Sequence, residues 1–120
     1  MKAKLNYNKK QIEIPDIKEC KGIFKAIGLM FHTKNTSARL FQFKTDKRIA
    51  IHSLFCPSFL AIWLDEKNKI LEYKLVFPSE ISLKPQTPFR KLLEIPVNNK
   101  YSKIISFFLG DKKDLNTPSS

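Results

Sequence analysis

The chain has 120 residues, of which 42% are apolar and 28% charged, so it can bury one hydrophobic core and is not expected to be disordered. Its 22 Lys and Arg outnumber its 11 Asp and Glu, giving a formal net charge of +11, which raises the hypothesis of a nucleic acid or an acidic protein surface as partner. Two cysteines are too few for a disulfide framework and are expected to be reduced thiols. We predict one domain over residues 1–115, followed by a frayed tail at 116–120.

The N-terminal segment is polar and basic, without the apolar stretch of a secretory signal. The longest apolar run, residues 54–64, is about half the length that a membrane-spanning helix needs, and Pro57 interrupts it. We therefore expect a soluble, cytoplasmic protein without a membrane span.

The positive charge is concentrated in the first half of the sequence, where residues 1–48 contain twelve Lys and Arg against four Asp and Glu. Lysine outnumbers arginine 19 to 3 in the whole chain, although phosphate and groove recognition favours arginine. Lysine, isoleucine, phenylalanine and asparagine, which use A/T-rich codons, make up 49 of the 120 residues. The charge therefore has two explanations, a polyanion-binding surface or the base composition of the genome.

Residues 1–15 alternate in polarity and predict one or two short strands. Residues 16–31 then place apolar side chains at helical spacing. Asp16 and Glu19 are spaced as in a capping box, and Gly28 is typical of a helix end. We predict a helix over residues 16–31.

The remainder of the chain predicts strands separated by short turns. The predicted strands are 40–43, 48–55, 59–64, 70–77 and 89–97, with turns at 45–47 and 65–68, a bend at 56–58 and a loop at 78–88. A second, short helix fits residues 101–108. The predicted fold class is mainly β (α+β), a compact curved antiparallel sheet or partly closed barrel with the 16–31 helix over one opening.

Several short motifs occur in a fixed order along the chain. They are Gly28-Leu29-Met30-Phe31, Leu40-Phe41-Gln42-Phe43, Trp63-Leu64-Asp65-Glu66, Pro78, Leu93-Glu94-Ile95-Pro96 and Gly110-Asp111. This ordered set, which spans residues 12–115, resembles the family called domain of unknown function 192, or uncharacterised protein family 0127. The resemblance implies a small, mainly β fold with one or two helices, and it implies no particular reaction or ligand.

Two segments depart from the pattern of that family. Ala38-Arg39 stand where Gly-Met is usual, and Ser58-Phe59-Leu60 stand where the family has Pro-Leu-Asp or Pro-Ile-Asp. The family's acidic residue is therefore replaced by Leu60. If that aspartate serves a shared function, this chain lacks the function or performs it with another group.

The sequence indicates neither a metal site nor a nucleophilic centre. His52 and Cys56 share a face of the predicted strand, but four strand residues separate them by about 13 Å, too far for one zinc ion. Only the tertiary fold could bring His32 to them. Ser53 points away from His52, which disfavours a catalytic triad, and three scattered glycines cannot form a phosphate-binding loop. We predict no metal and no cofactor, and we favour a non-enzymatic protein.

Acidic residues near the motifs supply the remaining candidates for catalysis. Asp65 and Glu66 lie in a predicted turn, where Asp commonly accepts hydrogen bonds from its own backbone. Glu94 interrupts an apolar strand and is expected either on the solvent face or in a pair. The catalytic candidates are His52, Asp65 and Glu94, in a cleft between the 16–31 helix and the central hairpin.

Aromatic and lysine residues offer a binding surface instead. The strand aromatics are interpreted as core, because aliphatic residues flank them: Phe41, Phe43, Phe55, Phe59, Trp63 and Phe77. Lys18, Lys21 and Lys25 recur at i, i+3 and i+7 and would form one stripe on the 16–31 helix. That stripe is either a polyanion-binding face or an ordinary solvated face.

The leading hypothesis is a small non-enzymatic binding or accessory module whose lysines contact RNA, DNA or an anionic protein. The alternative is an enzyme or small-ligand-binding protein that uses the cleft beside the central hairpin. A third hypothesis is a subunit interface in which a sheet edge pairs with a partner.

Overall fold

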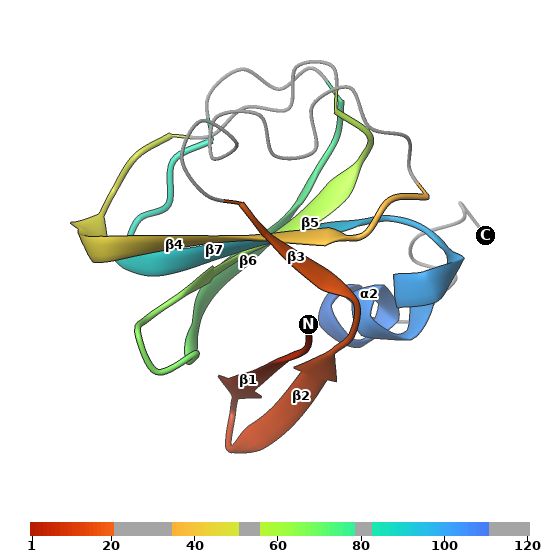
Figure 1. Cartoon of the computed structure of the whole chain (residues 1–120), viewed down its shortest axis with the longest axis horizontal. Helices are drawn as coiled ribbons and strands as arrows, with labels where there is room; N and C mark the ends of the chain where they lie inside the picture. Colours follow the sequence, from red (N-terminus) through yellow and green to blue (C-terminus); the bar gives the residue numbers. More distant parts are fainter. Residues whose placement is uncertain (21–34, 51–55, 79–82, 111–120) are drawn as a thin grey trace.

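The computed structural model describes residues 1–20, 35–50, 56–78 and 83–110 (Figure 1). Those residues form seven strands, one 3-10 helix and one α-helix. The strands are β1 (Ala3–Tyr7), β2 (Lys10–Ile14), β3 (Ile17–Cys20), β4 (Ala38–Lys47), β5 (Phe59–Leu64), β6 (Ile70–Val76) and β7 (Phe89–Pro96). The helical segments are η1 (Asn99–Tyr101) and α2 (Ser102–Leu109).

Five strands form the main sheet in the order β3-β4-β7-β5-β6, and β1 and β2 form a separate two-stranded sheet. β3 runs parallel to β4, while every other neighbouring pair is antiparallel. The main sheet is strongly twisted and curved, and the two sheets do not close into a barrel (Figure 1). The predicted mainly β fold class is therefore confirmed. The strands expected at 59–64, 70–77 and 89–97 and the helix expected at 101–108 are correct to within one residue at each end.

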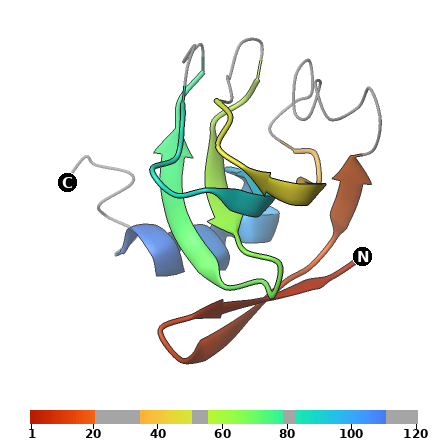
Figure 2. The ribbon, with the colours of Figure 1, turned by 90° about the vertical axis from the view of Figure 1, so that its left-hand side faces the viewer.

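The β1–β2 hairpin is joined by a tight turn at Asn8 and Lys9. Both residues have positive φ angles, 48° and 66°, which is the geometry of a two-residue type I′ turn. Leu5 faces inward and is fully buried. Asn6 N donates to Asn68 O at 2.9 Å, so β1 is held against the turn between β5 and β6, and Figure 2 shows the hairpin passing below that turn.

The helix predicted over residues 16–31 is wrong at its start, because Ile17–Cys20 is strand β3. Asp16 does not cap a helix; its φ of 50° is left-handed and marks the junction between β2 and β3. Ile17 and Cys20 are three residues apart, a spacing that fits a helix. In a strand the same spacing places them on opposite faces, and both faces of this sheet are packed. Residues 21–31 lie outside the described part of the chain.

β4 is longer than the sequence predicts. It continues through Lys47, so the turn expected at 45–47 is wrong. A register shift between Gln42 and Lys47 allows its outer, solvent-exposed half to remain paired with β7. Residues 48–50 are not in a strand, and residues 51–55, which include His52, lie outside the described residues.

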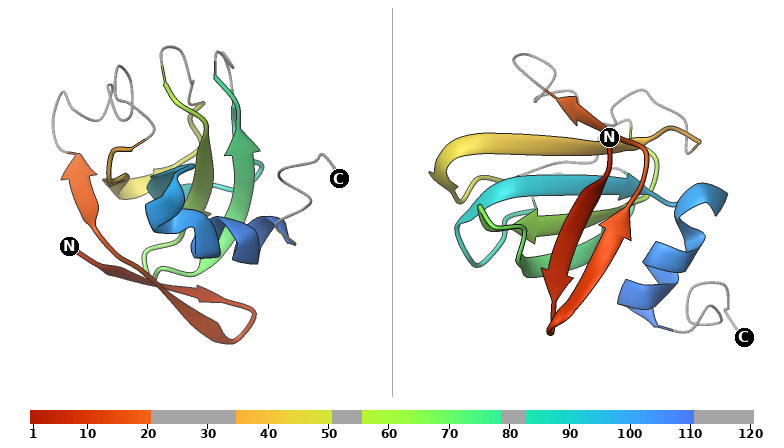
Figure 3. Two further views of the ribbon diagram at one scale, coloured as in Figure 1. Left: turned by 90° about the vertical axis from the view of Figure 1, so that its right-hand side faces the viewer. Right: turned by 60° about the horizontal axis from the view of Figure 1, so that its bottom comes forward.

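The main sheet is buried on both faces. One face packs against the β1–β2 hairpin and the C-terminal helical segments (Figure 3), and η1 and α2 contribute Tyr101, Ile105 and Phe108 to this core. The residues on the main-sheet side of this first core are Ile17, Ala38, Leu40, Leu60, Ile62, Leu64, Ile70, Leu93 and Ile95. Within the described residues, the helix that covers an opening is thus the C-terminal α2, whereas the sequence analysis assigned that position to a helix in the N-terminal half.

The opposite face of the main sheet carries a second core, which is rich in aromatic residues. Its buried aromatics on the sheet are Phe41, Phe59, Trp63 and Phe89, which confirms the core interpretation of the first three. Phe43 is half-buried, with its ring centroid 5.8 Å from that of Phe89. Phe77 is 59% exposed, so its assignment to the core is wrong; it follows the last residue of β6. Phe55 lies outside the described residues.

Candidate functional site

Asp65 stabilises the turn between β5 and β6. Its Oδ1 accepts hydrogen bonds from the backbone N–H groups of Lys67 at 2.8 Å and Lys69 at 2.9 Å. The neighbouring Glu66 carboxylate lies 3.5 Å from Arg90 Nη1. The carboxylate of Asp65, one of the three catalytic candidates, therefore serves to stabilise the turn.

Glu94 lies in the middle of the main sheet and is only 5% exposed. In the strand register it stands directly between Arg39 of β4 and Ala61 of β5. Asp65 follows Ala61 by four positions, which corresponds to about 13 Å along a strand. The fold therefore does not bring Asp65 and Glu94 together, and the third candidate, His52, lies outside the described residues.

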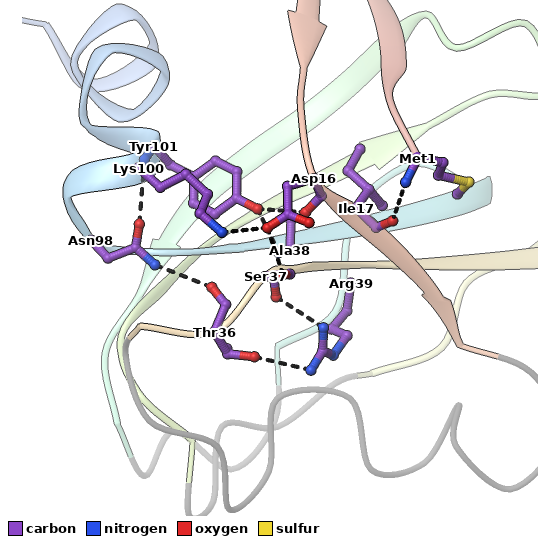
Figure 4. A network of polar contacts seen from close by, with 10 residues as sticks. All are labelled: Met1, Asp16, Ile17, Thr36, Ser37, Ala38, Arg39, Asn98, Lys100 and Tyr101. Carbon is purple, nitrogen blue, oxygen red and sulfur yellow. Dashed lines mark hydrogen bonds and ion pairs between the residues drawn. The ribbon is translucent and has the colours of Figure 1, made fainter.

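Arg39 is the second buried charge, with 6% exposure. Its guanidinium donates from Nη1 to Ser37 O at 3.2 Å and from Nη2 to Thr36 Oγ1 at 3.0 Å (Figure 4). Arg39 and Glu94 occupy opposed positions on neighbouring strands, where Cβ atoms lie about 5 Å apart. Sequence reasoning missed this arrangement, because the register between β4 and β7 is set by tertiary structure.

The two thiols share the sheet face of these charges. Burial raises the pKa of Cys20, and burial, with a smaller contribution from Glu94, raises the pKa of Cys56 to about 11. Both are consequently protonated near neutral pH and are poor nucleophiles and metal ligands. The described residues also contain no cluster of three or more His, Cys, Asp or Glu side chains that could hold a metal ion.

Asp16 and Tyr101 form a polar network that ties the β2–β3 junction to β4 and η1 (Figure 4). The Tyr101 hydroxyl donates to Asp16 O at 2.6 Å and accepts from Ala38 N at 2.9 Å. Asp16 Oδ2 accepts from Ser37 Oγ at 2.7 Å and from Lys100 Nζ. Because Tyr101 is fully buried and all three elements belong to the fold, we interpret this network as structural.

The pKa values in this network follow its contacts. Hydrogen bonds from Lys100 and then Ser37 hold the pKa of Asp16 below its ordinary value. The same bond to Asp16 raises the pKa of Lys100, and burial raises the pKa of Tyr101.

Four exposed lysines lie on the N-terminal hairpin or immediately before it. The hairpin lysines are Lys2, Lys4, Lys9 and Lys10, all exposed. Lys18 is also exposed, but it lies on β3, so the predicted helical stripe is not formed at its first residue. Lys21 and Lys25 lie outside the described residues.

A cluster of aromatic rings lies where the hairpin meets α2. Tyr7 contacts Tyr73 of β6 and Phe107 of α2, with ring centroids 5.9 and 6.3 Å apart. Phe108 is buried, and its ring centroid lies 5.0 Å from that of Tyr73 and 5.2 Å from that of Phe107. Phe107 remains 44% exposed. We name Tyr7, Tyr73, Phe107 and Phe108 the aromatic cluster.

The hydroxyl groups and nearby charges give the aromatic cluster a polar rim. A hydrogen bond to the Tyr7 side chain, together with burial, raises the pKa of Tyr73. Lys10 stands directly opposite Tyr7 in the hairpin register, and Lys103 lies one helical turn before Phe107 on α2. The sequence analysis missed this cluster, because its members come from three distant segments and none follows a recognisable motif.

Neither a protein-family model nor a curated protein matches the chain. Two solved structures share its fold. A protein of unknown function from Novosphingobium aromaticivorans DSM 12444 has a TM-score of 0.66 and 15% identity, covering 84% of this chain and 75% of that one. A protein described as a candidate transcription regulator, from Sinorhizobium meliloti 1021, has a TM-score of 0.67 and 13% identity, covering 86% of this chain and 83% of that one.

At these identities the two structures establish the fold alone. Membership of the domain of unknown function 192 family stays a prediction. Among the described helices, none has the length and apolar character required to cross a membrane.

Proposed function

We propose that this chain is a small non-enzymatic binding or accessory module that binds a polyanion through the lysines of its N-terminal half. The observation that carries the proposal is the exposure of the four hairpin lysines on one short two-stranded ribbon. Exposed ammonium groups can approach phosphates or carboxylates with little desolvation, so such a surface attracts anionic partners over long range.

The acidic residues support this proposal, because most of those in the described residues already serve the fold. Asp16 is paired with Lys100 and Glu66 with Arg90. Glu72 accepts hydrogen bonds from the backbone N–H groups of Gln86 and Thr87 at 2.6 and 2.9 Å. The two strands of the hairpin contain a single acid, Glu13, which stands opposite Lys4.

A nucleic acid is the polyanion that we favour. One of the two structures with this fold is described as a candidate transcription regulator, which agrees with a nucleic-acid partner. At 13% identity the likeness of the two structures supports the shared fold alone. An acidic protein surface is the competing partner. Lys18, an exposed residue of β3, is a further proposed contact outside the hairpin, and for Lys21 and Lys25 the proposal rests on sequence alone.

The test is a titration with labelled single- and double-stranded oligonucleotides and with heparin at low and moderate salt. We expect affinity to fall by roughly tenfold or more over a fourfold rise in salt if about three phosphates are contacted. The double variant Lys9→Glu/Lys10→Glu should weaken binding strongly. Lys44→Glu/Lys47→Glu is the matched control, because it makes the same charge change on exposed residues of β4. Equal losses in both variants would contradict a hairpin site.

A second candidate function is a small-ligand site on the sheet face around Glu94. Trp63 lies on this face, two positions from Ala61, and is 3% exposed. Its Nε1 has no hydrogen-bond partner among the described residues, although buried indole N–H groups usually have one. A ligand acceptor beside Glu94 would satisfy it. Since Trp63 is the only tryptophan, a shift of its emission in a small-molecule screen, lost in Glu94→Gln, tests this function.

A further inference from the structure

We propose that the polyanion is a single-stranded nucleic acid, and that one of its bases stacks on Phe107 at the aromatic cluster. This inference rests on the proposed function and names its ligand class. It is argued from the geometry of the aromatic cluster and from the positions of nearby lysines in the fold. The total charge of the chain does not enter the argument.

Phe107 is the exposed member of an otherwise packed set of rings. The rings of Tyr7 and Phe108 meet it edge to face, at interplanar angles of 80° and 90°. These contacts hold the Phe107 side chain in place, while its 44% exposure leaves ring surface open to solvent. A fixed, exposed ring is the element on which proteins stack unpaired bases.

Three lysines lie on the two elements, the hairpin and α2, that supply Tyr7 and Phe107. Lys10 is directly opposite Tyr7 in the hairpin, so its side chain leaves the ribbon on the same face as the Tyr7 ring. Lys9 is the adjacent residue at the turn. Lys103 and Phe107 are four residues apart on α2 and therefore share one side of the helix.

The arrangement places base-stacking and phosphate-binding groups on one side of the molecule. In both views of Figure 3 the closed end of the hairpin and the last turn of α2 lie on the same side. The hairpin turn (residues 8–9) and α2 contain no acidic residue. We name Lys9, Lys10, Lys103 and the aromatic cluster the aromatic–lysine site.

A single strand fits the aromatic–lysine site better than a duplex. In a duplex the faces of the bases are stacked on one another, and a protein meets only their edges and the backbone. An unpaired base offers its face, and stacking on an aromatic side chain strengthens binding with little dependence on sequence. An acidic protein or heparin would use the lysines but gain nothing from Phe107.

The experiment compares Phe107→Leu with the wild type against four probes: oligothymidylate and oligouridylate of about 15 nucleotides, a duplex of the same length, and heparin. Leucine keeps an apolar, helix-forming side chain but removes the aromatic face. We expect affinity for both single strands to fall about tenfold, while heparin binding is unchanged. A preference for oligouridylate over oligothymidylate would support the inference and indicate contact with the 2′-hydroxyl.

Phe107→Trp is the second variant, since it restores an aromatic face. We expect wild-type affinity or better, with quenching of the added indole emission by the single strands and none by heparin. Circular dichroism and thermal unfolding check that both variants remain folded.

Different results would overturn the two proposals separately. If Phe107→Leu binds every probe as the wild type does, the stacking inference fails and polyanion binding stands. If the wild type binds none of the probes at low salt, the proposed function fails as well. Tighter binding of the duplex than of the single strands would also overturn the inference.

Discussion

Charge is used in two opposite ways in this molecule. Arg39 and Glu94 are almost completely buried on central strands of the main sheet, whereas Lys9 and Lys10 are exposed at the end of a two-stranded ribbon. Buried charges need polar partners inside the protein, so they bind the structure together and are costly to disturb. Exposed lysines contribute little to stability, and their ammonium groups remain accessible for binding a ligand. The position of a charge, more than the net value of +11, therefore indicates what it does.

Removing the buried arginine is expected to have the largest effect on stability. Arg39→Met breaks the hydrogen bonds to Thr36 and Ser37 and removes the positive charge opposite Glu94. We expect a loss of about 3 kcal/mol in the free energy of unfolding, measured by urea titration. The control Arg90→Met, at a partly exposed arginine, should cost less than about 1 kcal/mol. Equal losses of unfolding free energy in the two variants would contradict the view that the buried arginine matters more for stability than the exposed one.

The Tyr101 hydroxyl offers a second, smaller test of the buried side of the comparison. Tyr101→Phe leaves the buried Ala38 N–H without its acceptor and removes the donor to Asp16 O. The expected loss is about 2 kcal/mol. Tyr73→Phe removes a hydroxyl whose hydrogen bond is to Tyr7, another partly buried side chain, and is expected to lose less than about 1 kcal/mol. Thermal unfolding of the two variants measures the difference, and an equal shift would argue against a structural role for the network.

Asp16 lies between the two extremes, since its carboxylate is exposed yet paired with Lys100. The pKa of Asp16 in the folded protein is lowered below 3.8, so its contribution to stability is present above that pH and is lost as the pH falls through the lower folded value. Asp16→Asn keeps a residue that tolerates the left-handed backbone. The variant should be less stable than the wild type near neutral pH, and the difference should shrink in acid. A difference that is constant with pH would show that the charge of Asp16 plays no part.

The Cys56 thiol gives the smallest expected signal. With a pKa of about 11, it should react slowly with a thiol reagent at neutral pH and faster as the pH rises toward that value. In the folded Cys20→Ser variant Cys56 is the one remaining thiol, so the rate of labelling reports on Cys56 alone. Fast labelling at neutral pH would instead indicate a thiolate, and would reopen a nucleophilic role for the sheet face around Glu94.

Local sequence patterns predicted much of the fold and little of the site. The apolar run 59–64 was predicted as a strand from its length and its flanking turn signals, and Asp65 signalled the turn after it. The spacing of Ile17 and Cys20 satisfied both a helix and a strand with two packed faces, so periodicity alone selected the wrong element. Glu94 was expected on the solvent face or in a pair, and its burial depends on the register of β7 with its neighbours.

The aromatic cluster was beyond the reach of sequence reasoning for a related reason. Tyr7, Tyr73 and Phe107 are separated by dozens of residues, and only the contact of β1 with β6 and the packing of α2 bring their rings together. By contrast, the excess of lysine in the first half was visible at once, and the structure added that Lys2, Lys4, Lys9 and Lys10 are exposed on or beside one hairpin.

The central claim is that the hairpin end of the molecule binds a polyanion, and the most direct measurement is the affinity of wild type and Lys9→Glu/Lys10→Glu for a labelled oligothymidylate at two salt concentrations. We predict salt-sensitive binding by the wild type, with a loss of at least about tenfold in the variant and a smaller loss in Lys44→Glu/Lys47→Glu. Absence of binding at low salt, or equal binding by all three proteins, would contradict the claim.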